Sequence, residues 1–449
     1  MAVQGLNHRL QRLNTGSVAF GVTALAAAAL SLAAALAGLH AGSRDATTVS
    51  AVDEVAARNE RIAFFEQRVA ADPMDLIGLN SLAFEYLQRA RESGDVGDYA
   101  RAELAAERSL AVLPSDNLKG LLASASVRLV QHDFAGALTL AGRALVLKPR
   151  DAGAIGIRSD ALVGLGRYDD AERDLQTMVE IEPALPALSR LAGVAFLKND
   201  LLNAEDFWKQ AIARPEALPR ENVAWAQVQL GRLYLARGDL KRAEEQFQRA
   251  RRTFPGYVHA DAGIAAVRAA QERWQEAIDL YAGVQERRPE AAYMAALADV
   301  YERAGRAQDA ANERELIEGV DRIYRASGIS TDLQSSLFYS DHDMHPAAAL
   351  QMAQSAYDSA PGVYSADALA WALYSSGRFA EASTVSKEAL RYETPEASFY
   401  FHAGLIEAAL GHNGAAIDRL ETALRLNPYF SVRQAPEAKT ELDLLKGAR

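Results

Sequence analysis

The segment from Asp341 to His345 reads DHDMH and is the densest group of side chains with metal-binding chemistry in this sequence. Carboxylate oxygens and imidazole nitrogens are ligands for zinc and similar cations. The candidate metal ligands are Asp341, His342, Asp343 and His345. The same segment suits a turn between two helices, in which an Asp caps the second helix and Pro346 takes its first position. No other histidine is close in sequence to complete a coordination shell, so we favour the turn and keep the metal site as the alternative.

Signatures of known catalytic sites are absent from the sequence. It contains no GxxxxGKS/T phosphate loop, no GxSxG nucleophile elbow, no HExxH zinc motif and no GxGxxG turn after a strand. It has no cysteine, which excludes disulfides, thiolate metal sites and cysteine nucleophiles. Carboxylates are plentiful, but they suit the solvated faces of charged helices. We therefore predict that the protein is not an enzyme and uses no cofactor.

Composition and charge indicate a helical, acidic protein. Over 449 residues the formal net charge is −11, and only 14 residues are proline, which suits many helices. An acidic chain repels a phosphate backbone, and no basic stripe interleaved with aromatic residues is present. Nucleic acid is therefore not an expected partner.

An uncharged segment near the N-terminus has the length of a membrane span. Residues 13–43 contain no charged side chain, and as a helix the apolar core 18–39 would extend roughly 33 Å, enough for a hydrocarbon layer of about 30 Å. Arg9 and Arg12 precede the segment and acidic residues follow it, so the N-terminus is predicted to be cytoplasmic. The remainder of the chain would then lie on the periplasmic or extracellular side of a cytoplasmic membrane.

The same segment also fits an export signal. Ala35-Leu36-Ala37 is an acceptable cleavage site, but the apolar run is longer than most signal peptides have. We favour an uncleaved single-pass anchor and keep secretion after cleavage as the alternative. A buried helix of the main fold is less consistent with a run that has no polar face. The predicted divisions are a leader (1–16), an anchor or signal (17–40) and a linker (41–56).

Prolines reveal an internal repeat. Where neighbours can be compared they fall 33 to 35 residues apart, allowing for two double-length gaps: Pro114, Pro149, Pro183, Pro255, Pro289, Pro361, Pro395 and Pro428. A proline at such a spacing ends one helix and helps to start the next. A fixed period of this length indicates a repeat architecture.

The clearest unit runs from Gln227 to Pro255. A first helix carries Leu230, Gly231 and Tyr234 on one face, Gly238-Asp239 makes a turn, and a second helix presents Ala243, Phe247 and Ala250. Small residues let the two helices approach closely, and the aromatic rings fill the space beside them. This pattern resembles the tetratricopeptide repeat, and units in the same phase recur about ten times between residues 75 and 428.

The resemblance implies an all-α fold, a right-handed superhelix of about ten helical hairpins. The predicted solenoid covers 57–430 and a capping helix covers 431–449. Residues 311–361 depart most from the pattern, because an elongated helix over 313–327 lacks the closing proline. Nearly the whole chain after residue 55 is similar to bacterial exported proteins that consist of these repeats and carry no catalytic domain.

In this family the first helix of each hairpin lines a concave groove, at the second, fifth, ninth and twelfth positions of the repeat. Carried over, the implied groove residues are Ile77, Asn80, Phe84, Leu87, Trp225, Val228, Arg232, Leu235, Tyr364, Asp367, Trp371 and Tyr374. Aromatic residues in such a groove are typical anchors for a bound peptide or helix. Packing between neighbouring hairpins is the alternative role for each of them.

Some relatives grip a carboxyl terminus through Lys at the fifth position and Asn at the ninth. Here those two positions hold other residues: Leu122/Ser126, Gly156/Asp160 and Ala262/Ala266. Such a clamp is not expected. The predicted function is a non-catalytic scaffold, assembly factor or subunit of an envelope complex that binds one or several proteins or peptides through the groove. The alternatives are a periplasmic metal- or small-ligand-handling protein that uses the segment Asp341 to His345, and a self-associating structural subunit.

Overall fold

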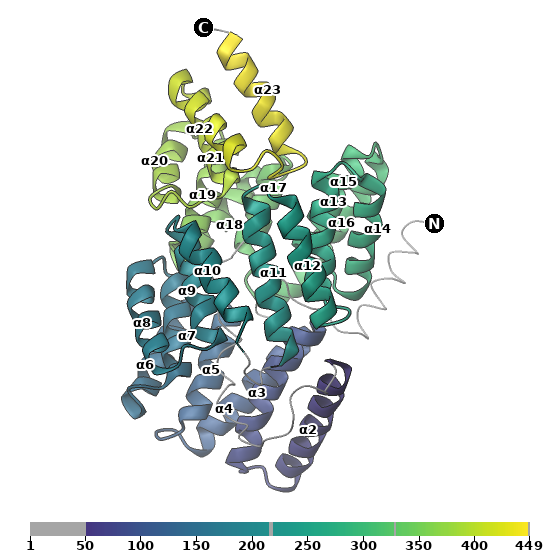
Figure 1. The fold of residues 1–449 in the computed structure, drawn as a ribbon. Helices are drawn as coiled ribbons and strands as arrows, with labels where there is room; N and C mark the ends of the chain where they lie inside the picture. The colour runs from purple at the N-terminus through teal and green to yellow at the C-terminus, as the bar shows by residue number, and fades with distance from the viewer. Residues whose placement is uncertain (1–50, 215–218, 327–328, 448–449) are drawn as a thin grey trace.

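A computed structural model describes residues 51–214, 219–326 and 329–447 of the chain. Within these ranges the protein is an all-α solenoid of 22 helices. Twenty of the helices form ten antiparallel hairpins, and one further helix precedes and another follows the array (Figure 1). The described part of the chain contains no strand.

Each hairpin has an inner first helix and an outer second helix. The first helices are α3 (Leu76–Ser93), α5 (Leu118–Val130), α7 (Ala152–Gly164), α9 (Leu185–Leu197), α11 (Arg220–Ala236), α13 (Val258–Ala270), α15 (Ala291–Arg303), α17 (Asp332–Asp341), α19 (Val363–Ser375) and α21 (Ala397–Ala409). The second helices are α4 (Val96–Val112), α6 (Phe134–Leu147), α8 (Tyr168–Ile181), α10 (Leu201–Ile212), α12 (Leu240–Thr253), α14 (Trp274–Arg287), α16 (Ala307–Ala326), α18 (Pro346–Ser359), α20 (Phe379–Ala389) and α22 (Asn413–Leu426). The flanking helices are α2 (Ala51–Ala71) and α23 (Gln434–Gly447).

Burial distinguishes the two kinds of helix. On the inner helix α9 every residue but Ala195 is buried, whereas on its partner α10 only Ala204, Trp208 and Ala211 are. An inner helix contacts the outer helix of its own hairpin and both neighbouring hairpins, so its residues are mostly apolar on every face. The outer helices keep a single apolar stripe with a solvated opposite face.

The turn inside each hairpin contains a residue with a left-handed backbone conformation. A residue with a left-handed backbone follows the first helix within two positions in all ten hairpins: Gly94, His132, Gly166, Asn199, Gly238, Glu272, Gly305, Asp343, Gly377 and Gly411. Glycine reaches this region without a steric penalty, which explains why it occupies six of these sites. Asp239 follows Gly238, and its carboxylate accepts a hydrogen bond from the backbone N–H of Arg242 at 3.0 Å. The predicted Gly238-Asp239 turn is confirmed.

Close packing within a hairpin depends on the small residues that the repeat places between the helices. A Cβ atom added at Gly231 would lie 2.6 Å from the Phe247 ring, closer than real contacts allow. Phe247 and Ala243 are both fully buried, and Tyr234 is nearly so. The interpretation of Gly231 as a site of close helix approach is therefore confirmed.

The array is irregular at two places. The first lies between the inner helices α9 and α11, which pack less closely on each other than the neighbouring inner pairs α7–α9 and α11–α13 do. The second is α16, which is extended to 20 residues and is followed by α17, the shortest described helix, with 10 residues. The second irregularity coincides with the predicted departure in residues 311–361, including the elongated helix.

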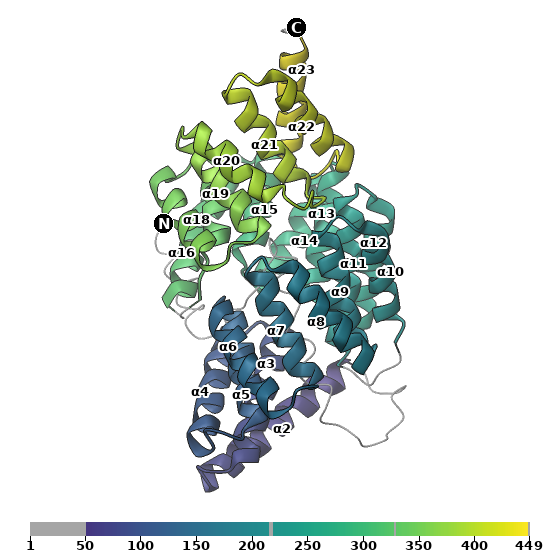
Figure 2. The same cartoon turned by 90° about the vertical axis from the view of Figure 1, so that its left-hand side faces the viewer.

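Hairpins far apart in sequence meet across the solenoid (Figures 1 and 2). The Tyr168 hydroxyl, on α8, accepts a hydrogen bond from the backbone N–H of Val363, on α19, at 3.0 Å. The hydroxyl of Thr394, just before α21, donates to the Leu197 carbonyl of α9 at 2.6 Å. Both bonds span nearly 200 residues of sequence, so the superhelix closes on itself instead of leaving an open groove along its whole length.

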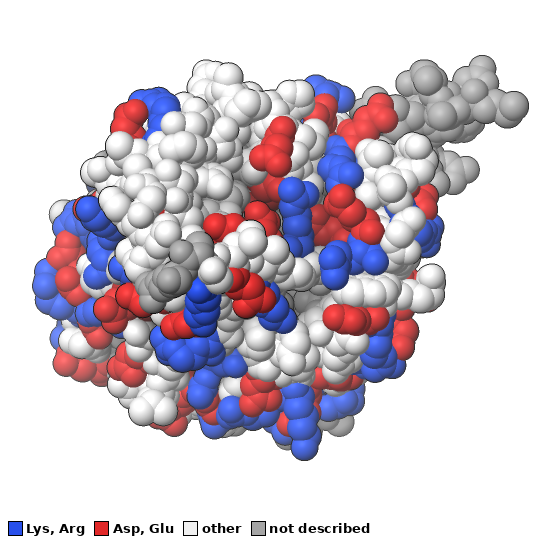
Figure 3. Space-filling model, turned by 90° about the horizontal axis from the view of Figure 1, so that it is seen from above, with Lys and Arg blue, Asp and Glu red and all other residues white. Residues whose placement is uncertain are grey.

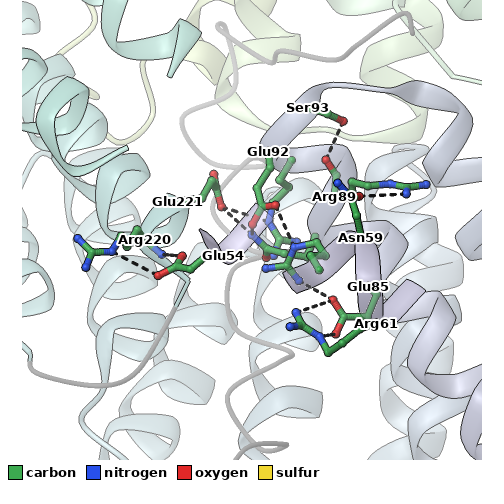
Figure 4. Close-up of polar contacts among 12 residues, drawn as sticks. Glu54, Asn59, Arg61, Glu85, Arg89, Glu92, Ser93, Arg220 and Glu221 are labelled. Atoms are coloured by element: carbon green, nitrogen blue, oxygen red, sulfur yellow. Dashed lines mark hydrogen bonds and ion pairs between the residues drawn. The ribbon is translucent and has the colours of Figure 1, made fainter. Parts of the chain in front are cut away.

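A second long-range contact joins α2 and α3 to the start of α11 (Figure 4). The carboxylate of Glu54 accepts from the backbone N–H of Arg220 at 2.9 Å. Arg58, also on α2, bonds Glu85 at 2.6 Å and Glu92 at 2.9 Å, both on α3. The first helix is thereby fixed to the hairpin that follows it and to the middle of the chain.

No helix in residues 51–214, 219–326 or 329–447 has both the length and the apolar character needed to cross a membrane. The predicted anchor or signal, residues 17–40, lies outside these ranges.

Candidate functional site

A cavity of about 450 Å³ lies where the inner helices of the closed solenoid converge. Its walls come from seven consecutive helices α9 to α15, from α17, α19 and α21, and from the segment that joins α22 to α23. This segment is held in place because the side-chain amide of Asn427 donates to the Leu235 carbonyl at 2.9 Å. The cavity is therefore a product of closure, assembled from the middle and the C-terminal hairpins.

Arg232 supplies a positive charge to the cavity wall. It lies on α11 at the ninth repeat position and is half-buried. Within the described residues its guanidinium makes no hydrogen bond and no ion pair. Burial raises the pKa of the carboxyl groups of Glu290 and Glu396. The positive charge of Arg232 lowers both pKa values, but by less than burial raises them.

Glu396 and Asp341 are acidic residues of the cavity wall, and burial raises the pKa of both. Burial raises the pKa of Glu396 to about 7, although the hydroxyl of Tyr364 donates to this carboxylate at 2.7 Å. Burial likewise raises the pKa of Asp341 to about 6. Asp341 accepts hydrogen bonds from the indole N–H of Trp371 at 2.9 Å and from the Gln434 amide at 2.8 Å. Each of these carboxylates thus has a donor from the protein.

Asp367 and His402 form a buried pair at the same wall. The Nδ1 atom of His402 lies 3.0 Å from the Asp367 carboxylate. Burial lowers the pKa of His402, but the Asp367 charge outweighs that effect and the pKa is raised above its ordinary value. The imidazole also stacks on Trp371, with ring centroids 4.2 Å apart. The pair is therefore rigidly placed and internally satisfied.

The predicted groove residues separate into buried and accessible groups. Deep burial, with no more than 7% of the residue exposed, places six of them in contacts between helices: Phe84, Leu87, Val228, Tyr364, Asp367 and Trp371. Half-buried positions hold Asn80, Trp225, Arg232, Leu235 and Tyr374, and Ile77 is 65% exposed. Four of the twelve line the central cavity: Arg232, Leu235, Tyr364 and Asp367. The structure therefore brings the middle and C-terminal groups together, while the group on α3 lies apart.

Other residues of the cavity were not predicted as groove residues, although Asp341 was a candidate metal ligand. Trp225 and Val228 occupy the second and fifth repeat positions, and two units later the same positions hold Tyr293 and Ala296. Tyr293 and Ala296 line the cavity, so the repeat pattern could have identified them. Glu396 precedes α21 and Asp341 ends α17, outside the fixed groove positions. Only closure of the array brings these two carboxylates to the site.

The four candidate metal ligands lie in different environments and do not face a common point. Asp341 faces the cavity, while the Nε2 atom of His342 contacts Asp299 at 2.9 Å. The Asp343 side chain is 87% exposed, and His345 contacts Glu318 at 3.1 Å. In the described part of the chain no three His, Asp or Glu side chains are arranged to hold a metal ion.

The turn itself forms as predicted in one respect. Pro346 is the first residue of α18, but the residue that caps this helix is His345 and not an aspartate. The prediction of an Asp cap was wrong, because His345 adopts a left-handed backbone immediately before the proline.

Sequence comparison identifies the repeats. Two models of the tetratricopeptide repeat match the chain, one at residues 184–255 and the other at 122–186, 228–292 and 368–433. A search of curated proteins gave no match.

Three of the solved structures that are similar to this chain are a thermophilic TPR protein, Tom70 and IFIT1. A thermophilic TPR protein of Thermus thermophilus is 24% identical, with 38% of this chain and 91% of that chain covered and a TM-score of 0.35. Yeast Tom70 is 14% identical, with coverage of 87% and 92% and a TM-score of 0.36. IFIT1, solved with m7Gppp-AAAA, is 14% identical, with coverage of 78% and 80% and a TM-score of 0.43. The in-phase hairpins and the two repeat models, which together match more than half of the residues, show that this chain belongs to the tetratricopeptide-repeat family.

Proposed function

We propose that this protein is a non-catalytic scaffold or assembly factor that holds partner proteins in a complex of the cell envelope. The observation that carries the proposal is the series of ten hairpins in the described residues, with one inner helix each. Repeat proteins of this family generally act as protein-interaction scaffolds, since a stacked array presents a long surface to extended or multiple partners.

Closure of the array limits where a partner binds. The bonds from Tyr168 to Val363 and from Thr394 to Leu197 occupy part of the inner surface. Outside the cavity, the predicted groove positions that keep solvent access are Ile77, which is exposed, and Asn80, Trp225 and Tyr374, which are half-buried. A partner therefore docks on these accessible positions of the inner surface through apolar and aromatic contacts.

Surface charge agrees with a protein partner. The end of the molecule that carries α23 shows acidic and basic side chains interspersed, with an uncharged area beside them (Figure 3). Such a mixed surface does not provide the basic track that a nucleic acid backbone requires. The overall charge of −11 acts in the same direction.

The location is part of the proposal. The uncharged segment 17–40 with arginines before it supports a single-pass anchor with the repeats on the periplasmic side, and secretion after cleavage is the alternative. Protease accessibility in intact spheroplasts and the N-terminal mass of the mature protein distinguish these cases. Protection of the repeats from protease would contradict both.

Site-specific photo-crosslinking tests the docking surface. A photoreactive phenylalanine analogue at Ile77 or Tyr374 should give discrete adducts with a partner in native membranes. The matched controls are Val146 and Leu202, which are 81% and 80% exposed on outer helices. Adducts from the outer positions alone would overturn the inner-surface proposal, and adducts with a second copy of the chain would identify a self-associating subunit.

A further inference from the structure

The central cavity contains an imbalance of polar partners. The three wall carboxylates have donors from the protein: Asp341 from Trp371 and Gln434, Asp367 from His402, and Glu396 from Tyr364. Arg232 lines the same cavity, and within the described residues no acceptor bonds its guanidinium. The group that lacks a partner is therefore the cation.

An unpaired guanidinium in a recess favours an oxyanion from outside the protein. Arginine is planar and stays charged, and it binds a carboxylate or phosphate with two parallel N–H donors. Water can solvate Arg232 in the free protein because the side chain is half-buried. A ligand that enters and expels this water must itself supply acceptor atoms.

The remaining walls select the body of the ligand. The rings of Trp208, Phe247, Tyr281, Tyr293 and Phe399 line the cavity. A volume of about 450 Å³ falls within the range of roughly 300 to 1,000 Å³ that is usual for small-molecule sites. A largely apolar molecule of modest size fits this space, whereas a folded protein element does not.

The nearby acidic groups select the charge of the ligand. Glu396, Asp367 and Asp341 line the same cavity as Arg232. Like charges at close range repel, and a dianion such as a phosphate monoester would meet three carboxyl groups here. His402 is paired with Asp367, so Arg232 is the cation that remains to balance the ligand. A single carboxylate matches the single guanidinium.

We propose that the central cavity binds a small monocarboxylate with an apolar body, whose carboxylate contacts the Arg232 guanidinium and whose body lies among the aromatic rings. This site is separate from the proposed docking surface for proteins at Ile77 and Tyr374. A ligand held between α11, α15, α19 and α21 would also join the middle hairpins to the C-terminal ones, since these helices all contribute to the wall.

Isothermal titration of the full-length protein with 1-naphthoate tests the proposal. Its neutral isostere 1-naphthamide and the dianion 1-naphthyl phosphate serve as comparison probes. We expect saturable binding of the acid, with at least about tenfold weaker binding of the amide and the phosphate, which corresponds to about 1.4 kcal/mol.

Two substitutions identify the site. Arg232→Gln should weaken the acid at least tenfold and leave the amide unchanged. The matched control Arg252→Gln removes the same charge from an exposed position on α12 and should change neither. Ala266→Phe, which fills the cavity from α13 without a change of charge, should block both probes and keeps the test valid should Arg232→Gln fail to fold.

Several results would overturn the proposal. They are equal affinity for the acid and the amide, tighter binding of the phosphate, unchanged affinity in Arg232→Gln, or no saturable binding of the acid up to about 1 mM.

Discussion

The contact between Tyr168 and Val363 is the sharpest test of closure. Tyr168 is 1% exposed and Val363 is fully buried, and their hydrogen bond measures 3.0 Å. Val363 is the first residue of α19, where a backbone N–H has no acceptor within its own helix. Tyr168→Phe keeps the ring but leaves this buried N–H without a partner, so we expect a cost of about 1 to 3 kcal/mol.

Hydrogen exchange followed by mass spectrometry measures this cost locally. If the contact opens more readily, peptides from the start of α19 should exchange roughly 5 to 150 times faster in Tyr168→Phe. Thermal unfolding should begin at a lower temperature. Tyr429→Phe is the matched control, because Tyr429 is 45% exposed and its hydroxyl bonds no other described residue.

Unchanged exchange at α19 in Tyr168→Phe would refute the reasoning. It would mean that the packing of α8 on α19 holds the two regions together without this bond. Faster exchange spread over every helix would indicate global destabilisation, and the contact would then have no special role in closure.

Two further predictions concern packing and pH. Gly231→Ala should lower the melting temperature, because its Cβ would lie 2.6 Å from the Phe247 ring and overpacking costs about 1 to 3 kcal/mol, more than the helix gains from alanine. Gly283→Ala, whose Cβ meets nothing within 4 Å, should raise it, and equal effects of the two changes would contradict the close approach. Burial raises the pKa of Glu396 from 4.5 to about 7, so its contribution to stability is present at low pH and is lost as the pH rises through about 7. Glu396→Gln should therefore flatten the fall in melting temperature between about pH 5 and 8, and an unchanged slope would refute the assignment.

Much of the fold was predictable because the contacts that define the repeat are local in sequence. The Gly238-Asp239 turn and the approach of Gly231 to Phe247 involve residues of one hairpin, within 20 positions of each other. Such contacts recur at a fixed period, so the sequence displays them many times. The same periodicity leads from Trp225 to Tyr293, a residue of the cavity wall.

Closure was not predictable, because it depends on how small deviations accumulate along the array. The stacking departs from the regular pattern between α9 and α11, which pack less closely than other inner pairs, and at α16, which is extended to 20 residues. Closure joins Thr394 to Leu197, a pair of residues that no feature of the repeat pattern connects. The repeat pattern implies a concave groove, and it contains no signal for the cavity that closure forms.

The ninth position of the repeat has different roles in different hairpins. In one hairpin its side chain forms a buried ion pair, and in another its charged side chain forms no ion pair with a described residue. In α7 this position is Asp160, and it pairs with Arg190 of α9 at 2.9 Å, with both side chains no more than 2% exposed. The Arg190 guanidinium also lies against Gly156, so this pair fills the inner surface of its hairpins. In α11 the same position is Arg232, which faces the cavity and bonds no described residue.

This contrast predicts opposite costs for removing the two charges. Asp160→Asn leaves a buried guanidinium without its counterion and should cost about 3 to 5 kcal/mol. Arg232→Gln removes a half-buried cation that forms no hydrogen bond or ion pair with a described residue and acts on Glu290 and Glu396 only through its charge, so stability should change much less than in Asp160→Asn. Thermal unfolding of both variants beside the wild type measures the difference. A loss of stability in Arg232→Gln as large as that in Asp160→Asn would show that Arg232 holds the fold, and the case for a ligand at the guanidinium would then lose its physical basis.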